Sequence, residues 1–290
     1  METLPSASAE FLSSFVASAA LNTVDAQGEA LRASLWPVAR RAFPSLPPLE
    51  DATTAVVTML FVNLVVIFGP TYGRWSRGAT NNPVACVMRA LAGRASGMRA
   101  AACAGASIAA HVASYAMIAS AVKSHPRMFP GKAPMVPMYP TGGFARGVVA
   151  EAAVTSANFI FFGLAEKRFP SALLPALGSA FYVFTMLVEG CRYSCGFMNP
   201  STVIASHVVS GNVFSLDALE AIATYVVGAM LGCVIVLMVM KVFMPKSRSA
   251  MRARATSKAA VRSISAARER AGTAGSAGSA RRRSVSARKK

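Results

Sequence analysis

Apolar residues in this 290-residue chain gather into long stretches that are separated by short polar connections. A helix that crosses a bilayer needs about 20 mostly apolar residues, at a rise of roughly 1.5 Å per residue. The first stretch is the least continuous, because Asn22, Asp25 and Gln27 interrupt it. The pattern predicts six membrane-spanning helices, at about residues 8–27, 52–69, 98–122, 147–166, 170–190 and 218–244.

Two shorter apolar segments, at about residues 83–92 and 200–210, are too short to cross a membrane. Each begins with an asparagine-proline pair, Asn82-Pro83 or Asn199-Pro200. Proline suits the first position of a helix, because its missing N–H would have no partner there. Backbone that leaves a helix at membrane depth is tolerated only where it is buried in protein or lines a wet cavity. We therefore expect two re-entrant half-helices that border a pore or a binding site.

An internal repeat relates the two halves of the chain. Residues 9–14 and 150–155 both read Ala-Glu-x-x-x-Ser or Thr, at the start of the first and fourth expected helices. With three helices per half, the second copy has inverted topology, so the half-helices should enter from opposite faces and meet near the midplane. The sequence thus predicts an all-α membrane domain over residues 1–245, an inverted repeat whose halves span about 8–122 and 147–244.

The positive charge of the chain is concentrated at its end. Hydrophobic residues make up 54% and charged residues 14% of the chain, whereas a soluble domain carries about a quarter charged residues. Of the net charge of +18, +13 lies in residues 246–290, where 14 Lys and Arg face the single Glu269. This tail has no aromatic residue, so we expect it to be disordered and to contact anionic lipid rather than nucleic acid. Ser284 follows three arginines and suits a basophilic kinase, with a merely solvated tail as the alternative.

The basic residues also predict an orientation. Lys and Arg favour cytoplasmic loops, and they are frequent around the first asparagine-proline pair, at Lys167 and Arg168, and in the tail. Both termini should therefore be cytoplasmic, in a protein integral to the plasma membrane or to an organelle membrane.

Two sequence motifs resemble those of the aquaporin, or major intrinsic protein, superfamily. The family's first pore motif reads Ser-Gly-Ala-His-Leu-Asn-Pro-Ala-Val, and residues 77–85 read Arg-Gly-Ala-Thr-Asn-Asn-Pro-Val-Ala. The second family motif, Gly-x-x-Asn-Pro-Ala-Arg, corresponds to residues 196–202, Gly-Phe-Met-Asn-Pro-Ser-Thr. Val84, Ser201 and Thr202 depart from the family pattern, as in its unorthodox branches. The sixth expected helix carries Gly-Ala-Met-Leu-Gly at residues 228–232, a small-residue spacing that the family shares.

The resemblance implies roles for the residues of these motifs. Asn82 and Asn199 would donate their side-chain amides to a passing water or hydroxyl oxygen, next to Pro83 and Pro200. The N-termini of the two half-helices would repel cations. Glu10 and Glu151, which are costly inside a membrane, would accept backbone N–H bonds from the re-entrant loops and hold them in shape.

The family's selectivity filter is located by spacing from the two asparagines. It falls on Val62, Leu187, Gly196 and Thr202, with Thr185 in place of Leu187 if two residues are inserted before the second motif. This set lacks the family's usual bulky aromatic, histidine and arginine, so the pore mouth should be wider and less cationic.

His111 lies in the third expected helix among small residues, at a spacing that suits close helix packing. We expect it to be a hydrogen-bonded packing residue.

The function that follows is passive passage of water and small neutral solutes such as glycerol, urea or ammonia, by a homotetramer as in the family. A non-conducting membrane scaffold and an ion-coupled secondary transporter are the alternatives. No nucleophile, base or metal constellation is visible in the sequence, so we expect neither an enzyme nor a metal or cofactor.

Overall fold

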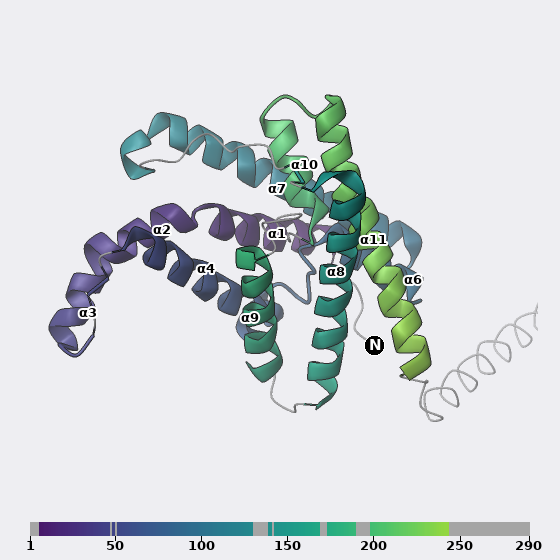
Figure 1. Cartoon of the computed structure of the whole chain (residues 1–290), viewed down its shortest axis with the longest axis horizontal. Helices are drawn as coiled ribbons and strands as arrows, with labels where there is room; N and C mark the ends of the chain where they lie inside the picture. The colour runs from purple at the N-terminus through teal and green to yellow at the C-terminus, as the bar shows by residue number, and fades with distance from the viewer. Residues whose placement is uncertain are drawn as a thin grey trace, which may run out of the picture. The chain divides into compact units, whose positions relative to one another are not determined.

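The computed structural model describes residues 6–46, 48–49, 51–129, 139–140, 142–168, 173–189 and 198–243. Every regular element within these ranges is helical (Figure 1). The chain divides into two units, Met1–Met238 and Val239–Lys290, and the described part of the second unit is residues 239–243. The elements are α1 (Ala7–Asn22), α2 (Val24–Ala30), the π-helical turn η1 (Leu31–Leu35), α3 (Trp36–Ala42), α4 (Ala52–Phe68), α5 (Pro70–Trp75), α6 (Pro83–Leu91), α7 (Gly97–Ser124), the 3₁₀ turn η2 (Pro126–Met128), α8 (Gly143–Arg168), α9 (Leu173–Glu189), α10 (Pro200–Val209) and α11 (Leu216–Phe243).

Each apolar stretch that the sequence singled out contains a helix. Helices α1, α4, α7, α8, α9 and α11 fall on the six long stretches, and α6 and α10 fall on the two short ones. Among the described helices, α7 and α11 are long and apolar enough to cross a membrane by themselves. A membrane crossing by all six, with α6 and α10 re-entering, therefore stays a prediction.

The first stretch differs from the single helix expected at about 8–27. Helix α1 ends at Asn22, and Thr23 leaves helical geometry with φ −111° and ψ 11°. The Thr23 hydroxyl donates to the carbonyl of Ala19 at 2.8 Å, and the Asn22 amide donates to the carbonyl of Ser18 at 2.9 Å. Side chains that bind the preceding turn in this way compete with the helical ladder and bend or end a helix. The chain then continues through α2, η1 and α3, so helix extends beyond the expected end.

Side-chain caps account for the start of several helices. Ser6 accepts the N–H of Ala9 at α1, and Ser96 accepts the N–H of Arg99 at α7. Asp51 begins α4 by accepting the Thr54 hydroxyl at 2.7 Å and the backbone N–H groups of residues 53 and 54. These bonds, that from the Thr54 hydroxyl foremost, hold the pKa of the Asp51 carboxyl below its usual range. Each cap supplies a partner to N–H groups that have none inside the helix.

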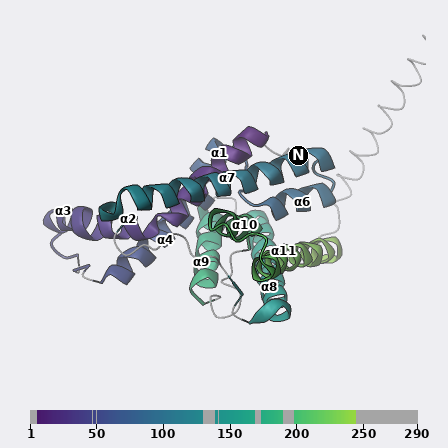
Figure 2. The same cartoon turned by 90° about the horizontal axis from the view of Figure 1, so that it is seen from above.

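Helix α7 is the element against which α1, α6 and α10 pack, while α4 packs against α2 and α9, and α8 against α9 (Figure 2). The seam between α1 and α7 is made of small and polar residues. Ser14 Oγ on α1 donates to Ser107 Oγ on α7 at 3.1 Å, and both side chains are fully buried. Small side chains let the two backbones come close. Because α6 and α10 also pack against α7, both short helices share one support.

Two glycines set the approach of α11 to α8. A Cβ added at Gly228 would lie 2.6 Å from the Cβ of Glu151 and 2.9 Å from the carbonyl oxygen of Val148. A Cβ added at Gly232 would lie 2.8 Å from the carbonyl oxygen of Ala152. Only residues without a side chain allow this approach, so the four-residue spacing of these glycines determines how α11 meets the helix that carries Glu151.

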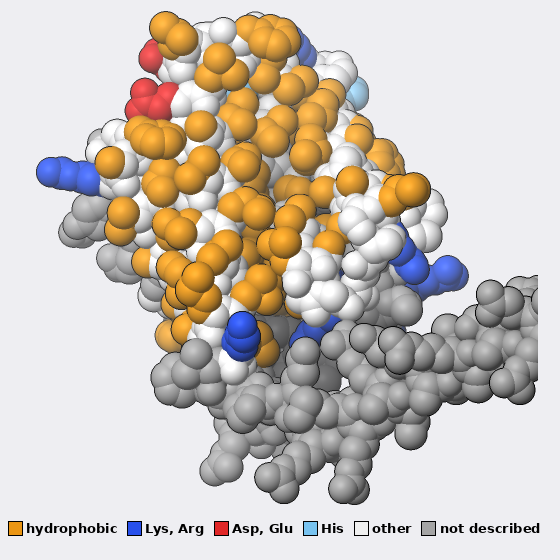
Figure 3. All heavy atoms as spheres, turned by 90° about the vertical axis from the view of Figure 1, so that its right-hand side faces the viewer, with side chains coloured by type: hydrophobic (Ala, Val, Ile, Leu, Met, Phe, Trp, Pro, Cys, Tyr) orange, Lys and Arg blue, Asp and Glu red, His pale blue; other side chains and the backbone are white. Residues whose placement is uncertain are grey.

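One face of the molecule is covered with hydrophobic side chains, with acidic groups gathered near its upper edge (Figure 3). Within α11, no charged residue occurs between Glu220 and Lys241. Its large apolar side chains on the surface include Leu219, Val226, Val227, Leu231, Val234, Ile235 and Met238. An apolar surface of this extent is typical of contact with lipid or with another protein subunit.

We predict that Gly228→Leu lowers the free energy of unfolding by about 2 kcal/mol, the usual range for overpacking a closely packed site. The thermal midpoint of the purified protein in detergent measures the loss. Gly105→Leu on α7 is the matched control, because a Cβ at Gly105 has no neighbour within 4 Å. Equal losses in the two variants would show that the α8–α11 approach does not depend on Gly228.

Candidate functional site

The two asparagine-proline turns are joined by a reciprocal pair of side-chain hydrogen bonds. Asn82 Nδ2 donates to the carbonyl of Met198 at 2.7 Å, and Asn199 Nδ2 donates to the carbonyl of Asn81 at 2.8 Å. Each amide therefore reaches the residue that precedes the other asparagine, across 116 and 118 positions of the sequence. The structure thus brings together the two motifs that the sequence placed in opposite halves of the chain.

Each asparagine also caps the short helix that follows it. Asn82 Oδ1 accepts the N–H of Val84 at 3.0 Å, and Asn199 Oδ1 accepts the N–H of Ser201 at 3.1 Å. Both carboxamides are consequently oriented at both ends, with oxygen on their own helix and nitrogen on the opposite turn. The N-termini of α6 and α10 converge at this point, and each carries roughly half a positive charge.

The residue before each asparagine has left-handed backbone geometry. Asn81 has φ 55° and Met198 has φ 51°. A residue other than glycine adopts this geometry at a cost of about 1–3 kcal/mol, so surrounding bonds must hold it in place. The left-handed turn is what lets each peptide carbonyl face the opposite asparagine.

Glu10, on α1, is fully buried and binds the first turn through three hydrogen bonds. Its carboxylate accepts the Thr80 N–H at 3.0 Å, the Thr80 hydroxyl at 3.0 Å and the Asn81 N–H at 2.7 Å. Backbone donors that carry no partner of their own in this turn are therefore satisfied by a single side chain.

Glu151, on α8, occupies the corresponding place in the second half and is also fully buried. Its Oε2 accepts the N–H of Met198 at 3.0 Å. The two glutamates thus contact equivalent positions, the left-handed residue before each asparagine.

A second set of bonds ties the first turn to α1 and α5. Ser13 Oγ donates to Asn81 Oδ1 at 2.6 Å, and the Tyr72 hydroxyl donates to the Ser13 carbonyl at 2.6 Å. No sequence motif assigned a role to Ser13, Tyr72 or Asn81. The available signal was weak: Ser13 lies three residues after Glu10, on the same face of the helix.

His111, on α7, reaches the second turn. Its Nε2 lies 3.3 Å from Asn199 Nδ2, and its Nδ1 lies 2.8 Å from the carbonyl of Ser107. The ring is 4% exposed. The sequence predicted a hydrogen-bonded packing residue here, and the structure adds that one of its bonds is to a pore-motif asparagine.

The residues after the two prolines are buried in helix packing. Val84 is 3% exposed and packs with Ala229 and Cys233 of α11. Ser201 is fully buried, and its hydroxyl has no hydrogen-bond partner within the described part of the chain. The side chains at the two departures from the family's alanines are therefore both buried.

The expected filter residues are only partly described. Val62 on α4 is 42% exposed, and Thr202 on α10 is half-buried. The side chain of Leu187 and the whole of Gly196 lie outside the described residues. At the alternative position, the Thr185 hydroxyl donates to the carbonyl of residue 181 on its own helix at 2.9 Å. A filter built from these residues stays a prediction.

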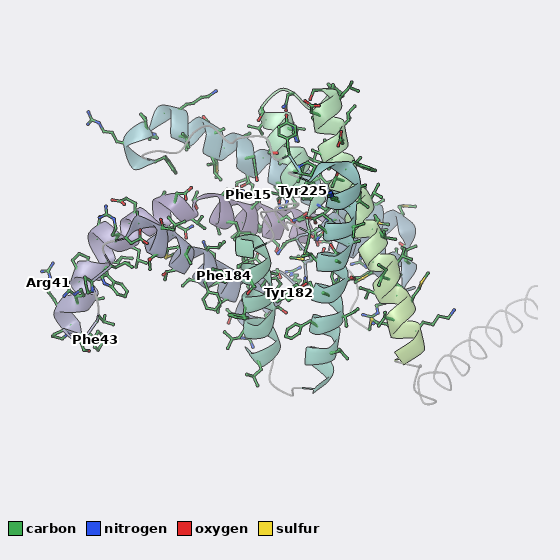
Figure 4. The ribbon with its side chains drawn as sticks, viewed as in Figure 1. Phe15, Arg41, Phe43, Tyr182, Phe184 and Tyr225 are labelled. Atoms are coloured by element: carbon green, nitrogen blue, oxygen red, sulfur yellow. The ribbon has the colours of Figure 1, made fainter. Side chains whose placement is uncertain are left out.

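Two large rings lie next to the expected filter positions. Phe61, which precedes Val62, and Phe184, which precedes Thr185, meet edge to face with centroids 5.5 Å apart, and Figure 4 shows Phe184 on α9 beside α4. Both pack in the cluster that contains Met198. The sequence predicts no large ring at the filter positions themselves, and these two rings occupy the neighbouring places.

Ser284 and the rest of the basic tail, residues 246–290, lie outside the described residues. No group of His, Cys, Asp or Glu with metal-binding geometry occurs among the residues that were described.

No family model matches the sequence, and no curated protein matches it. A search of solved structures finds a similar fold in the X-ray structure of the aquaglyceroporin from Plasmodium falciparum. The match has a TM-score of 0.56 and 14% sequence identity, and it covers 83% of this chain and 98% of that one. At this identity the likeness is one of fold, and it shows that the chain has an aquaporin-like architecture.

Proposed function

We propose that this chain is a passive transmembrane channel for water and small neutral solutes. The observation that carries the proposal is the meeting of two asparagine-capped helix N-termini, joined by reciprocal amide bonds between Asn82, Asn199 and the opposite turns. Irregular backbone of this kind is tolerated at membrane depth where it lines a wet cavity. The protein of similar fold is itself named an aquaglyceroporin.

The charge distribution at this meeting point suits neutral solutes. Two converging helix N-termini disfavour a cation through their partial positive charge, and an asparagine amide nitrogen can donate to an oxygen atom. Asn82 and Asn199 are both half-buried, so neither residue is closed off completely from its surroundings. Water and alcohols can accept such a hydrogen bond, whereas a metal cation cannot.

In this proposal the six long helices span the membrane and α6 and α10 re-enter it. The apolar lengths of α7 and α11 and the apolar surface of α11 support this arrangement. We further propose a homotetramer with both termini cytoplasmic, and a basic tail over residues 246–290 that contacts anionic lipid and carries a phosphorylation site at Ser284. These last points rest on the sequence and on the family resemblance.

Glu10 and Glu151 would brace the two turns. A buried carboxylate inside a membrane helix costs about 2.5–3.5 kcal/mol on insertion scales, so its hydrogen bonds must compensate. Both acids bind the N–H of the left-handed residue that aims a carbonyl at the opposite asparagine. We assign them the role of holding the asparagines in register rather than of carrying protons.

The pore would be narrowest at Val62, Thr202, Gly196 and either Leu187 or Thr185. Arginine, which the family has at the position of Thr202, offers a fixed charge and a planar fork of donors. Threonine keeps one hydroxyl and no charge, so neutral polyols, urea or ammonia should fit. Apolar neighbours disfavour polyols, because each unmet hydrogen bond costs about 1–3 kcal/mol.

The first test replaces Asn82 with Asp, which keeps the capping oxygen and removes both amide hydrogens. We expect osmotic water flux, measured by light scattering of proteoliposomes, to fall at least about tenfold, because the bond to the Met198 carbonyl becomes a repulsion worth more than 1.4 kcal/mol. Asn212→Asp is the charge-matched control, since Asn212 lies after α10 and bonds to Tyr139. Normal flux in Asn82→Asp at equal protein content would exclude Asn82 from the pore. Absence of flux in the wild type would favour the alternative of a non-conducting membrane scaffold.

Glu10→Ala tests the bracing role. We expect the free energy of unfolding to fall on the order of 3 kcal/mol, because two backbone N–H groups lose their acceptor inside the protein, and we expect flux to fall with it. Glu29→Ala is the control, since Glu29 forms a solvent-exposed pair with Arg32 at 2.7 Å, and its thermal midpoint should not change. An unchanged midpoint in Glu10→Ala would contradict the role.

Thr202→Arg tests the filter. We expect urea and glycerol fluxes to fall by a larger factor than water flux, because the arginine adds bulk and charge at the narrowest point. Thr202→Val keeps the shape of threonine without its hydroxyl and should still admit the same solutes by size. Equal fractional losses of water and solute flux in Thr202→Arg would place the constriction elsewhere, and the Phe61–Phe184 pair would be the next candidate.

A further inference from the structure

The side-chain amide of Asn199 has a partner for each of its polar positions. Its oxygen accepts the N–H of Ser201, and its nitrogen lies 2.8 Å from the carbonyl of Asn81 and 3.3 Å from Nε2 of His111. An amide nitrogen carries two hydrogens. One is used by the Asn81 carbonyl, and the other is directed to the histidine ring.

The tautomer of His111 follows from its other contact. Nδ1 lies 2.8 Å from the carbonyl oxygen of Ser107, one turn earlier on α7. A carbonyl oxygen only accepts, so Nδ1 carries the proton and Nε2 of the neutral ring has a free lone pair. That lone pair faces an amide N–H of Asn199 and can accept from it. If Nε2 carried the proton instead, two donors would face each other. The ring therefore accepts from Asn199.

Asn82 differs from Asn199 in this respect. Its oxygen accepts the N–H of Val84 and its nitrogen donates to the Met198 carbonyl. Among the described residues, no second acceptor contacts the Asn82 amide nitrogen. The two turns are alike in their caps, cross-bonds and glutamates, and the histidine breaks the symmetry.

The His111 ring is buried. It is 4% exposed and lies on α7, the helix against which α1 and α10 pack. The ring therefore does not lie on an exposed surface. A hydrogen directed to a buried ring is directed away from the exposed surface.

We propose that His111 is a positioning residue that holds the second amide hydrogen of Asn199 away from the pore, so that Asn82 is the stronger donor to a passing oxygen. This inference rests on the proposed channel function. Without the histidine contact the two asparagines at the pore centre would be equivalent donors. With it, Asn82 is the dominant donor.

The flux test removes the acceptor. His111→Leu leaves Asn199 capped and cross-bonded but frees its second hydrogen, so we expect water flux per protein to rise on the order of fivefold, the rate equivalent of one net hydrogen bond. His111→Gln places a carbonyl oxygen within reach of the same hydrogen and should restore flux toward the wild-type value. Ser114→Ala is the control on the same helix, one turn from His111.

Two backgrounds separate this role from general packing. In Asn199→Ser, which keeps a capping oxygen and has no amide hydrogens, His111→Leu should have no further effect. In Asn82→Ser, which should have a lower flux to begin with, His111→Leu should raise the water flux by the same factor as in the wild type. A rise that persists in Asn199→Ser, a fall of flux in His111→Leu, or a Gln variant that behaves like Leu would overturn the proposal.

A spectroscopic measurement decides the contact independently of conduction. With ¹⁵N-labelled histidine in the full-length protein, the signal of His111 is assigned by its loss in His111→Gln, among three histidines. We expect a protonated Nδ1 and a lone-pair Nε2 whose shift changes in Asn199→Ser and not in Asn82→Ser. A protonated Nε2, or an Nε2 that is insensitive to Asn199→Ser, would refute the contact, whereas absence of wild-type flux with the expected spectrum would refute only the channel.

Discussion

The reciprocal bonding of two asparagine side chains is the constraint on which the rest of this structure depends. Each amide binds the carbonyl before the other asparagine, at 2.7 and 2.8 Å. Neither turn can form these bonds alone, because each provides the acceptor for the other. Each of these carbonyls faces the opposite asparagine because Asn81 and Met198 adopt left-handed geometry. This geometry is costly for residues other than glycine. The buried glutamates Glu10 and Glu151 hold these two residues in that geometry through their N–H groups.

Helix packing makes this arrangement possible. Glu151 reaches Met198 from α8, and α11 approaches α8 closely because Gly228 and Gly232 have no side chains. On the other side, α7 supports α1, α6 and α10 together, through a seam of small polar residues. A membrane offers no hydrophobic driving force between helices, so close contact and buried hydrogen bonds must provide the association energy. Both are concentrated around the two turns.

The two asparagine-proline turns are closely symmetrical in their backbone bonds and asymmetrical in their surroundings. The first turn has the additional anchors Ser13 and Tyr72, and the second has His111. Equivalent asparagines can therefore differ in the hydrogen that each offers. In a narrow passage with few partners, the availability of one hydrogen bond of about 1 kcal/mol changes a rate severalfold, so in the proposed channel the asymmetry would bear directly on transport.

The sequence by itself determined the helices, because periodic apolar lengths and proline at the first helical position are local signals. The repeated motifs also allowed two features to be anticipated: that Asn82 and Asn199 meet, and that Glu10 and Glu151 have equivalent places in the two halves. The left-handed Asn81 and Met198, and the contact of His111 with Asn199, were decided by the tertiary structure. In each case the partner is a side chain or carbonyl from a distant part of the sequence, whose position depends on how separate helices pack. Histidine in a helix among small residues carries no local sign of what its ring will meet, since only the approach of α10 to α7 brings Asn199 within reach of it.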